Sequence, residues 1–147
     1  MNGAQTRPEG DVLTVQEADI AKRLESAIRD DIESDAQASI AFSRFMDLAL
    51  YHQELGYYMR GDMRVGADGD FTTAPMLSSA FSQALARQCA QVLMAMDGGV
   101  VRELGAGEGR MARDMLVALE TFGAVPRQYQ IVERSPSLRA RQKAKGR

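Results

Sequence analysis

Cysteine, histidine and long apolar runs are scarce in this chain, and each scarcity excludes a class of protein. The single cysteine, Cys89, rules out an internal disulfide, favours a reducing compartment and is expected in the core. The only histidine, His52, has no Cys/His cluster around it, so no metal site is expected. No apolar stretch approaches the ~20 residues that span a bilayer, so no membrane association is expected. The first residues also lack the patterns of a secretory signal or a transit peptide.

The composition is that of an ordinary globular domain of 147 residues, with 45% hydrophobic and 26% charged residues. A formal net charge of -2 gives no overall electrostatic reason to bind nucleic acid. Basic residues do gather in the last segment, 127–147, which holds seven Lys or Arg and one acid. We interpret this segment as the solvated face of a helix with a frayed end. A nucleic-acid patch is the alternative, although no interleaved aromatic residues support it.

Helical patterns dominate the first two thirds of the chain. Residues 1–13 lack periodicity and are expected to form a mobile tail. The capping-box pattern from Thr14 to Glu17 begins a predicted helix over 15–33, and a shorter helix is predicted over 43–51. After a glycine-rich stretch, Pro75 and Ser78 prepare a further helix that ends at Asp97-Gly98-Gly99. Its apolar stripe is predicted to face the core and consists of Phe81, Leu85, Cys89, Val92, Leu93 and Met96.

From residue 100 onward the pattern alternates between strand and helix. A strand is predicted over 100–104 and a second over 129–133, each followed by a helix. The intervening helix has an apolar stripe formed by Met111, Met115, Leu116, Leu119 and Phe122. The last helix is expected to begin at Ser135-Pro136, with Ser as N-cap. This order predicts a parallel sheet built by right-handed crossovers.

The loop between the first strand and its helix, Glu103 to Gly109, is the most informative segment. Its three alternate glycines allow backbone N–H groups to approach a ligand at a helix N-terminus, so contacts are expected from Gly105, Ala106, Gly107 and Gly109. The loop also contains Glu103 and Glu108, which would repel a pyrophosphate. Such a loop favours a ligand with an ammonium and a sulfonium group, which is S-adenosylmethionine.

Two acids at strand ends complete the predicted cofactor site. Glu133 ends the second strand, where its carboxylate could accept hydrogen bonds from both ribose hydroxyls, and Glu103 suits the methionine amino group. A dinucleotide fingerprint would need glycine at position 110, which is Arg110, and an acid closer than Glu133. A surface strand-end acid is the structural alternative for each of these glutamates.

Several segments together resemble the MidA family of class I S-adenosylmethionine-dependent methyltransferases. They span most of residues 20–145 and are Phe45 to Tyr51, Gly56-Tyr57-Tyr58, Gly69 to Pro75, Glu103 to Gly109 and Tyr129 to Gln142. The resemblance implies a Rossmann-like fold with an N-terminal extension, and one mitochondrial family member is a protein arginine methyltransferase. It also implies that Asp70, Phe71 and Thr73 lie over the cofactor, although a tight turn before a helix explains them nearly as well. Gln53 and Met76 depart from the family pattern, which usually has proline and an acid there.

The sequence thus predicts an incomplete α/β fold with the first two core strands and their helices. The expected divisions are a tail over 1–13, a mainly helical extension over 14–97 and the start of the cofactor-binding domain over 98–147. We interpret the chain as the N-terminal fragment of a methyltransferase acting on arginine of a protein substrate, with no catalytic residue assigned. The alternatives are a non-catalytic remnant or assembly module and a dinucleotide-dependent oxidoreductase. The uncovered sheet could pair with a second copy, and the expected location is the cytoplasm, or the mitochondrion in a eukaryote.

Overall fold

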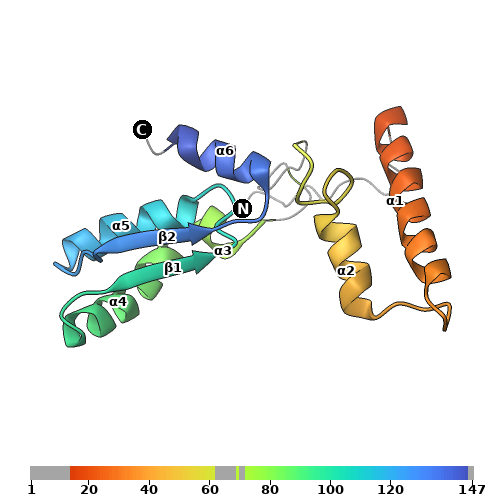
Figure 1. The fold of residues 1–147 in the computed structure, drawn as a ribbon. Helices are drawn as coiled ribbons and strands as arrows, with labels where there is room; N and C mark the ends of the chain where they lie inside the picture. Colours follow the sequence, from red (N-terminus) through yellow and green to blue (C-terminus); the bar gives the residue numbers. More distant parts are fainter. Residues whose placement is uncertain (1–13, 62–68, 70–71, 146–147) are drawn as a thin grey trace. The chain divides into compact units, whose positions relative to one another are not determined.

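The computed structural model describes residues 14–61, 69 and 72–145. The chain divides into two compact units, Met1–Met63 and Arg64–Arg147. The first unit contains the helices α1 (Val15–Ser34) and α2 (Phe42–Tyr51). The second contains α3 (Ala74–Leu77), α4 (Ser79–Ala95), β1 (Val100–Leu104), α5 (Arg110–Thr121), β2 (Gln128–Val132) and α6 (Pro136–Lys145), all labelled in Figure 1.

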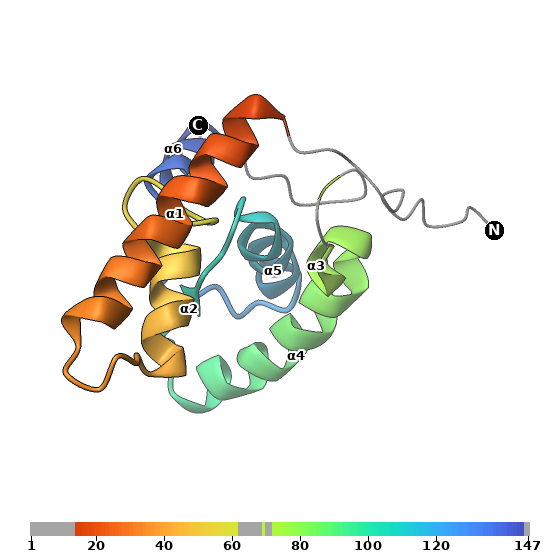
Figure 2. The same cartoon turned by 90° about the vertical axis from the view of Figure 1, so that its right-hand side faces the viewer.

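The first unit is a pair of helices that lie side by side in Figures 1 and 2. The predicted capping box begins α1, because Thr14 accepts from the Glu17 N–H and the Glu17 carboxylate accepts from the Thr14 N–H. A two-pronged ion pair joins the helices, with Arg44 donating to both oxygens of Asp31 at 2.9 and 2.8 Å. This hydrogen bonding lowers the pKa of Asp31.

The turn after α2 explains why the segment Gly56-Tyr57-Tyr58 needs its glycine. A Cβ at Gly56 would lie 2.4 Å from the backbone nitrogen of His52, so no larger residue fits. The backbone N–H of Gly56 donates to the His52 carbonyl at 2.9 Å. The two tyrosine rings pack edge to face, and Tyr58 also stacks on Tyr51.

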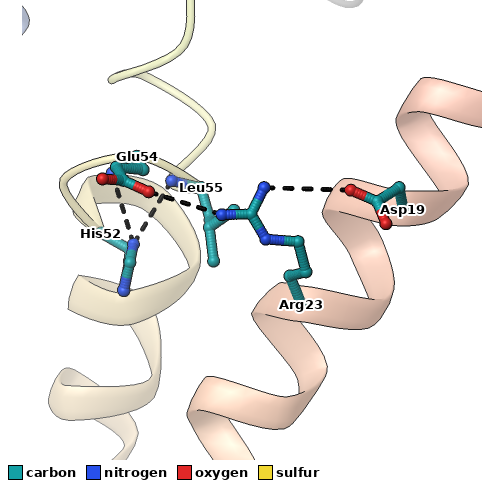
Figure 3. Close-up of polar contacts among 5 residues, drawn as sticks. All are labelled: Asp19, Arg23, His52, Glu54 and Leu55. Atoms are coloured by element: carbon teal, nitrogen blue, oxygen red, sulfur yellow. Dashed lines mark hydrogen bonds and ion pairs between the residues drawn. The ribbon is translucent and has the colours of Figure 1, made fainter.

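His52 serves this same turn, as Figure 3 shows. Its Nδ1 accepts from the backbone N–H groups of Glu54 and Leu55 at 3.4 and 3.3 Å. Beside it, Arg23 of α1 reaches Glu54 at 3.4 Å and Asp19 at 3.9 Å, and all three side chains are exposed. Exposed pairs of this kind add little stability.

In the second unit, β1 and β2 form the predicted parallel pair. The register aligns Val100 with Gln128 and Leu104 with Val132, and α5 connects the two strands. β2 ends at Val132, one residue earlier than predicted. The next residue, Glu133, accepts a hydrogen bond from the Ser135 N–H through its carboxylate, at the start of α6. As predicted, α6 begins after Ser135, whose hydroxyl accepts from the Leu138 N–H.

The helices α4 and α5 pack on each other and against one face of this sheet. The predicted orientation of α4 is wrong in large part. Phe81, Leu85, Val92 and Met96 are exposed, and of the expected stripe only Leu93 is buried, with Cys89 packed at the margin of the core. The buried face of α4 consists of Ser82, Ala86, Ala90 and Leu93.

The helix α5 follows its predicted stripe more closely. Met115 and Leu119 are almost wholly buried, and Met111 and Phe122 pack against the core, whereas Leu116 is exposed. Val101 of β1 and Tyr129 of β2 contact the same core from the sheet. Apolar residues on the other face of the strands stay exposed, namely Val100, Leu104 and Val132. The core of this unit therefore lies on one side of the sheet.

Candidate functional site

The candidate site is built on the glycine loop that joins β1 to α5. Gly105, Gly107 and Gly109 have positive φ values of 70°, 56° and 76°, a left-handed conformation that other residues rarely adopt. A Cβ at Gly105 or Gly107 would meet no heavy atom within 4 Å. The loop backbone is therefore open on that side, and its glycines are required by conformation and leave room for a ligand.

Backbone hydrogen bonds fix both ends of this loop. The Gly105 N–H donates to the Val132 carbonyl at the end of β2, at 2.9 Å. The Gly109 N–H donates to the carbonyl of Ala106, also at 2.9 Å, and Gly109 forms the N-cap of α5. The first turn of α5 therefore begins directly at the loop, which places the loop at a helix N-terminus as the sequence predicts.

Glu103 is 8% exposed and lies near the end of β1. Its carboxylate accepts a hydrogen bond of 2.8 Å from the Tyr129 hydroxyl, which also lies 3.6 Å from the Met115 sulfur. Burial raises the pKa of Glu103 above its ordinary value, and the hydrogen bond from Tyr129 opposes part of that rise. The pKa of the Tyr129 hydroxyl is itself raised, by burial first and then by Glu103.

The carboxylate of Glu108 forms an ion pair with a basic side chain of α6. Arg141 approaches the Glu108 carboxylate to 3.2 Å, with both side chains about one third exposed. The loop is thus acidic in sequence, but one of its two carboxylates is paired with an arginine and the other is bonded to a tyrosine. The negative character inferred from the sequence is weaker in the folded chain.

Glu133 follows β2 and stands at the carboxyl edge of the sheet, as predicted. One carboxylate oxygen, Oε1, accepts from the Ser135 N–H at 2.9 Å. Its second oxygen accepts no hydrogen bond from the described part of the chain. Arg139 donates to the Glu133 carbonyl at 3.1 Å, which further fixes this residue. The carboxylate is half-buried and held in place with one oxygen to offer.

The remaining predicted contacts come from the segment before α3. Asp70 and Phe71 lie outside the described residues. Thr73 is the exposed N-cap residue of α3, and its side chain makes no capping hydrogen bond. Met76, at the position where the family resemblance leads one to expect an acid, is half-buried within α3.

Sequence reasoning missed Tyr129 and Gln142 as residues of the site. Tyr129 lies two residues before Ile131, which pairs with Glu103, so strand alternation places it on the same face as that carboxylate. Gln142 follows Leu138 by four residues on α6 and donates to the Gly107 carbonyl at 2.7 Å. Helical spacing from the buried Leu138 was the available signal.

Two other kinds of site are absent from the part of the chain that the structure describes. No group of three or more His, Cys, Asp or Glu side chains there could hold a metal ion. Among the same residues, no helix has both the length and the apolar character needed to cross a membrane.

Comparison with known proteins identifies relatives of this arrangement. A family model described as a putative S-adenosyl-L-methionine-dependent methyltransferase matches residues 84–145. The mitochondrial protein arginine methyltransferase NDUFAF7 of Danio rerio is 34% identical over 110 residues, which cover 70% of this chain and 26% of the relative. The same protein of Xenopus tropicalis is 35% identical over 108 residues, covering 67% of this chain and 24% of the relative.

Solved structures agree with these relatives. A Burkholderia thailandensis protein crystallised with S-adenosyl-homocysteine superposes with a TM-score of 0.81 at 39% identity, covering 90% of this chain and 35% of that one. A second, native crystal structure from the same bacterium gives a TM-score of 0.74 at 40% identity, covering 90% and 33%. The chain therefore spans about a quarter of the curated relatives and about a third of the solved chains. It belongs to the MidA family of S-adenosylmethionine-dependent methyltransferases.

Proposed function

We propose that this chain carries the S-adenosylmethionine-binding segment of a class I methyltransferase with a Rossmann-like fold. The observation that supports this most is the loop of three left-handed glycines at the carboxyl end of β1, with Glu103 before it and Glu133 at the end of the neighbouring strand. In open parallel sheets, ligands bind beyond the carboxyl ends of the strands. The relative crystallised with S-adenosyl-homocysteine supports the same cofactor class.

The described residues fit such a cofactor. Space beside Gly105 and Gly107 lets the ligand approach the backbone closely. The second oxygen of Glu133 can accept from a ribose hydroxyl while Oε1 keeps its bond to Ser135. Glu103 offers Oε1 to an ammonium group, because Tyr129 holds Oε2.

When bound, S-adenosylmethionine supplies a methyl group on a positively charged sulfur, where a nucleophile can attack in line. The residues of this chain contribute by binding and orienting the cofactor, which is where most of the rate enhancement for such a transfer arises. No residue of the chain is assigned as catalytic base.

The acceptor that we propose is an arginine side chain of a protein, by analogy with the names of the curated relatives. Asp70, Phe71 and Thr73 are proposed to lie over the cofactor. Pairing of the exposed sheet face with a second copy and a cytoplasmic location also stay proposals.

Titration of the 147-residue chain with S-adenosyl-homocysteine tests the cofactor. We expect roughly micromolar binding by calorimetry. Glu133→Ala should weaken it by about 10- to 100-fold, because a charge-assisted hydrogen bond is lost. The affinity of Glu133→Gln should lie between those of the parent and Glu133→Ala, since the amide oxygen can still accept from the Ser135 N–H. Glu120→Ala, which removes an exposed acid of α5, is the matched control and should bind like the parent.

The alternatives give different results in the same experiment. Binding of NAD in place of S-adenosyl-homocysteine would establish a dinucleotide enzyme. A chain that unfolds cooperatively yet binds neither ligand would be a non-catalytic module. Either outcome contradicts the proposed function.

A further inference from the structure

Helix α6 contacts the glycine loop through two consecutive residues. Gln142 Nε2 donates to the carbonyl of Gly107, at the centre of the loop, at 2.7 Å. Arg141 pairs with Glu108, the next residue of the loop, at 3.2 Å. A Cβ at Gly109 would lie 3.7 Å from Gln142 Cγ, so the glutamine stem also packs against the end of the loop.

The amino-terminal end of α6 is firmly anchored, which gives these contacts a rigid base. Ser135 is fully buried and Leu138 is 4% exposed. The Ser135 hydroxyl accepts from the Leu138 N–H, and the Ser135 carbonyl accepts from the Arg139 N–H. Gln142 lies one helical turn beyond Leu138 on the same side of α6, so its position follows from that anchor.

The hydrogen bond from Gln142 determines how one peptide plane of the loop is turned. In a trans peptide the carbonyl oxygen and the following N–H point in opposite directions. A Gly107 carbonyl held toward α6 therefore directs the Glu108 N–H away from α6. Gly107 needs such a restraint more than most residues, because glycine has the largest conformational freedom to lose.

We infer that Gln142 is a positioning residue, which holds the glycine loop in its cofactor-binding shape from α6. The effect on cofactor binding rests on the proposed function. A loop that is already ordered binds S-adenosylmethionine without the entropic cost of ordering the loop. Arg141 supports the same restraint through Glu108. Two residues of the basic segment 127–147 thereby restrain the glycine loop directly.

Three substitutions of Gln142 separate the hydrogen bond from packing. Gln142→Met keeps the length and the apolar stem but loses the donor, Gln142→Glu replaces the donor with an acceptor, and Gln142→Lys keeps a donor. We expect Gln142→Met to weaken S-adenosyl-homocysteine binding by about five- to tenfold and Gln142→Glu by at least as much. Gln142→Lys should stay within about twofold of the parent. Lys143→Met, at the adjacent exposed position, is the control and should leave the affinity unchanged.

Amide hydrogen exchange of the ligand-free chain gives a readout that does not depend on cofactor binding. In Gln142→Met the amides of residues 105–109 should exchange about five- to tenfold faster, whereas those in the middle of α5 should not change. Parental affinity in Gln142→Met, or equal losses in the Met and Lys variants, would overturn the inference. If the parent chain binds no S-adenosyl-homocysteine, the proposed function fails, and unchanged loop exchange in Gln142→Met would then refute the positioning role separately.

Discussion

At the scale of single residues, Glu103 lies in an environment that disfavours its charge. It is 8% exposed, and Tyr129 is the hydrogen-bond partner of its carboxylate. Burial raises its pKa above the ordinary value of 4.5 despite that bond. The folded chain therefore binds a proton at Glu103 more tightly than the unfolded chain does. This group stabilises the fold most below its unfolded pKa, and the contribution is lost as pH rises through the folded pKa.

Glu103→Gln should remove this pH dependence, because the amide cannot lose a proton and can still accept from Tyr129. We expect the variant to become more stable relative to the parent as pH increases from about 4 to about 7.5, so that its free energy of unfolding minus that of the parent increases. Urea unfolding at both pH values measures the difference. A difference that is constant, or that changes in the opposite direction, would show that Glu103 is not held in a charge-disfavouring site.

The residues of the site could be predicted from the sequence only where the backbone decides their position. Gly105, Gly107 and Gly109 were identified because their spacing has a conformational meaning, and all three have positive φ. Tyr129 and Gln142 were missed, because their roles depend on which strand and which helix lie beside the loop. Pairing across 26 and 35 residues of sequence is not visible in local periodicity.

At the scale of elements, α4 shows how apolar size misleads a pattern-based prediction. The large apolar residues of this helix suggest a core stripe, but its buried face carries small residues, including Ala86 and Ala90. Small side chains allow α4 to approach α5 closely, where Ala112 and Ala118 are also buried. Alanine occurs on both faces of helices, so its role in a close helix contact becomes evident only from packing.

A larger side chain at the contact between α4 and α5 should therefore destabilise the chain more than a smaller side chain on the exposed face of α4. We expect Ala86→Leu to lower the free energy of unfolding by about 1 to 3 kcal/mol, because the new side chain has no space at a fully buried position. Val92→Ala, on the exposed face, should change it by less than about 0.5 kcal/mol. Urea unfolding of the two variants checks this, and the reverse ranking would restore the stripe predicted from the sequence.

The limits of most elements were more predictable than their faces. The capping box at Thr14 and the strand β1 lie where the sequence places them. Each has a local chemical signal, such as a hydroxyl at an N-cap or glycines after a β-branched run. The break between α3 and α4 at Ser78 was not expected, although Ser78 caps α4 as its residue type favours.

At the scale of the whole molecule, buried apolar surface is distributed unevenly between the two units. None of the residues of α1 is buried, whereas α5 buries Ala112, Met115, Ala118 and Leu119. Local opening costs least where few apolar contacts are lost. We expect α1 to open far more readily than α5.

Native-state hydrogen exchange should show this as faster exchange in the middle of α1 than in the middle of α5, by on the order of a hundredfold. Asp31→Asn should accelerate the amide exchange of α1 further, because it weakens the ion pair with Arg44, and should leave the exchange of α5 unchanged. Equal protection of the two helices would contradict the expectation.

The bond from Gly105 to the Val132 carbonyl has a consequence for how the chain must fold. It extends the hydrogen bonding between the two strands by one bond, or rung, into the loop. The register of the strands therefore also fixes the position of the loop. A misaligned chain that slipped by two residues would keep every side chain on its proper face, yet would shift this rung by about 7 Å. Such a molecule would look native by its helical and strand content, while its ligand-facing turn would be assembled in the wrong place.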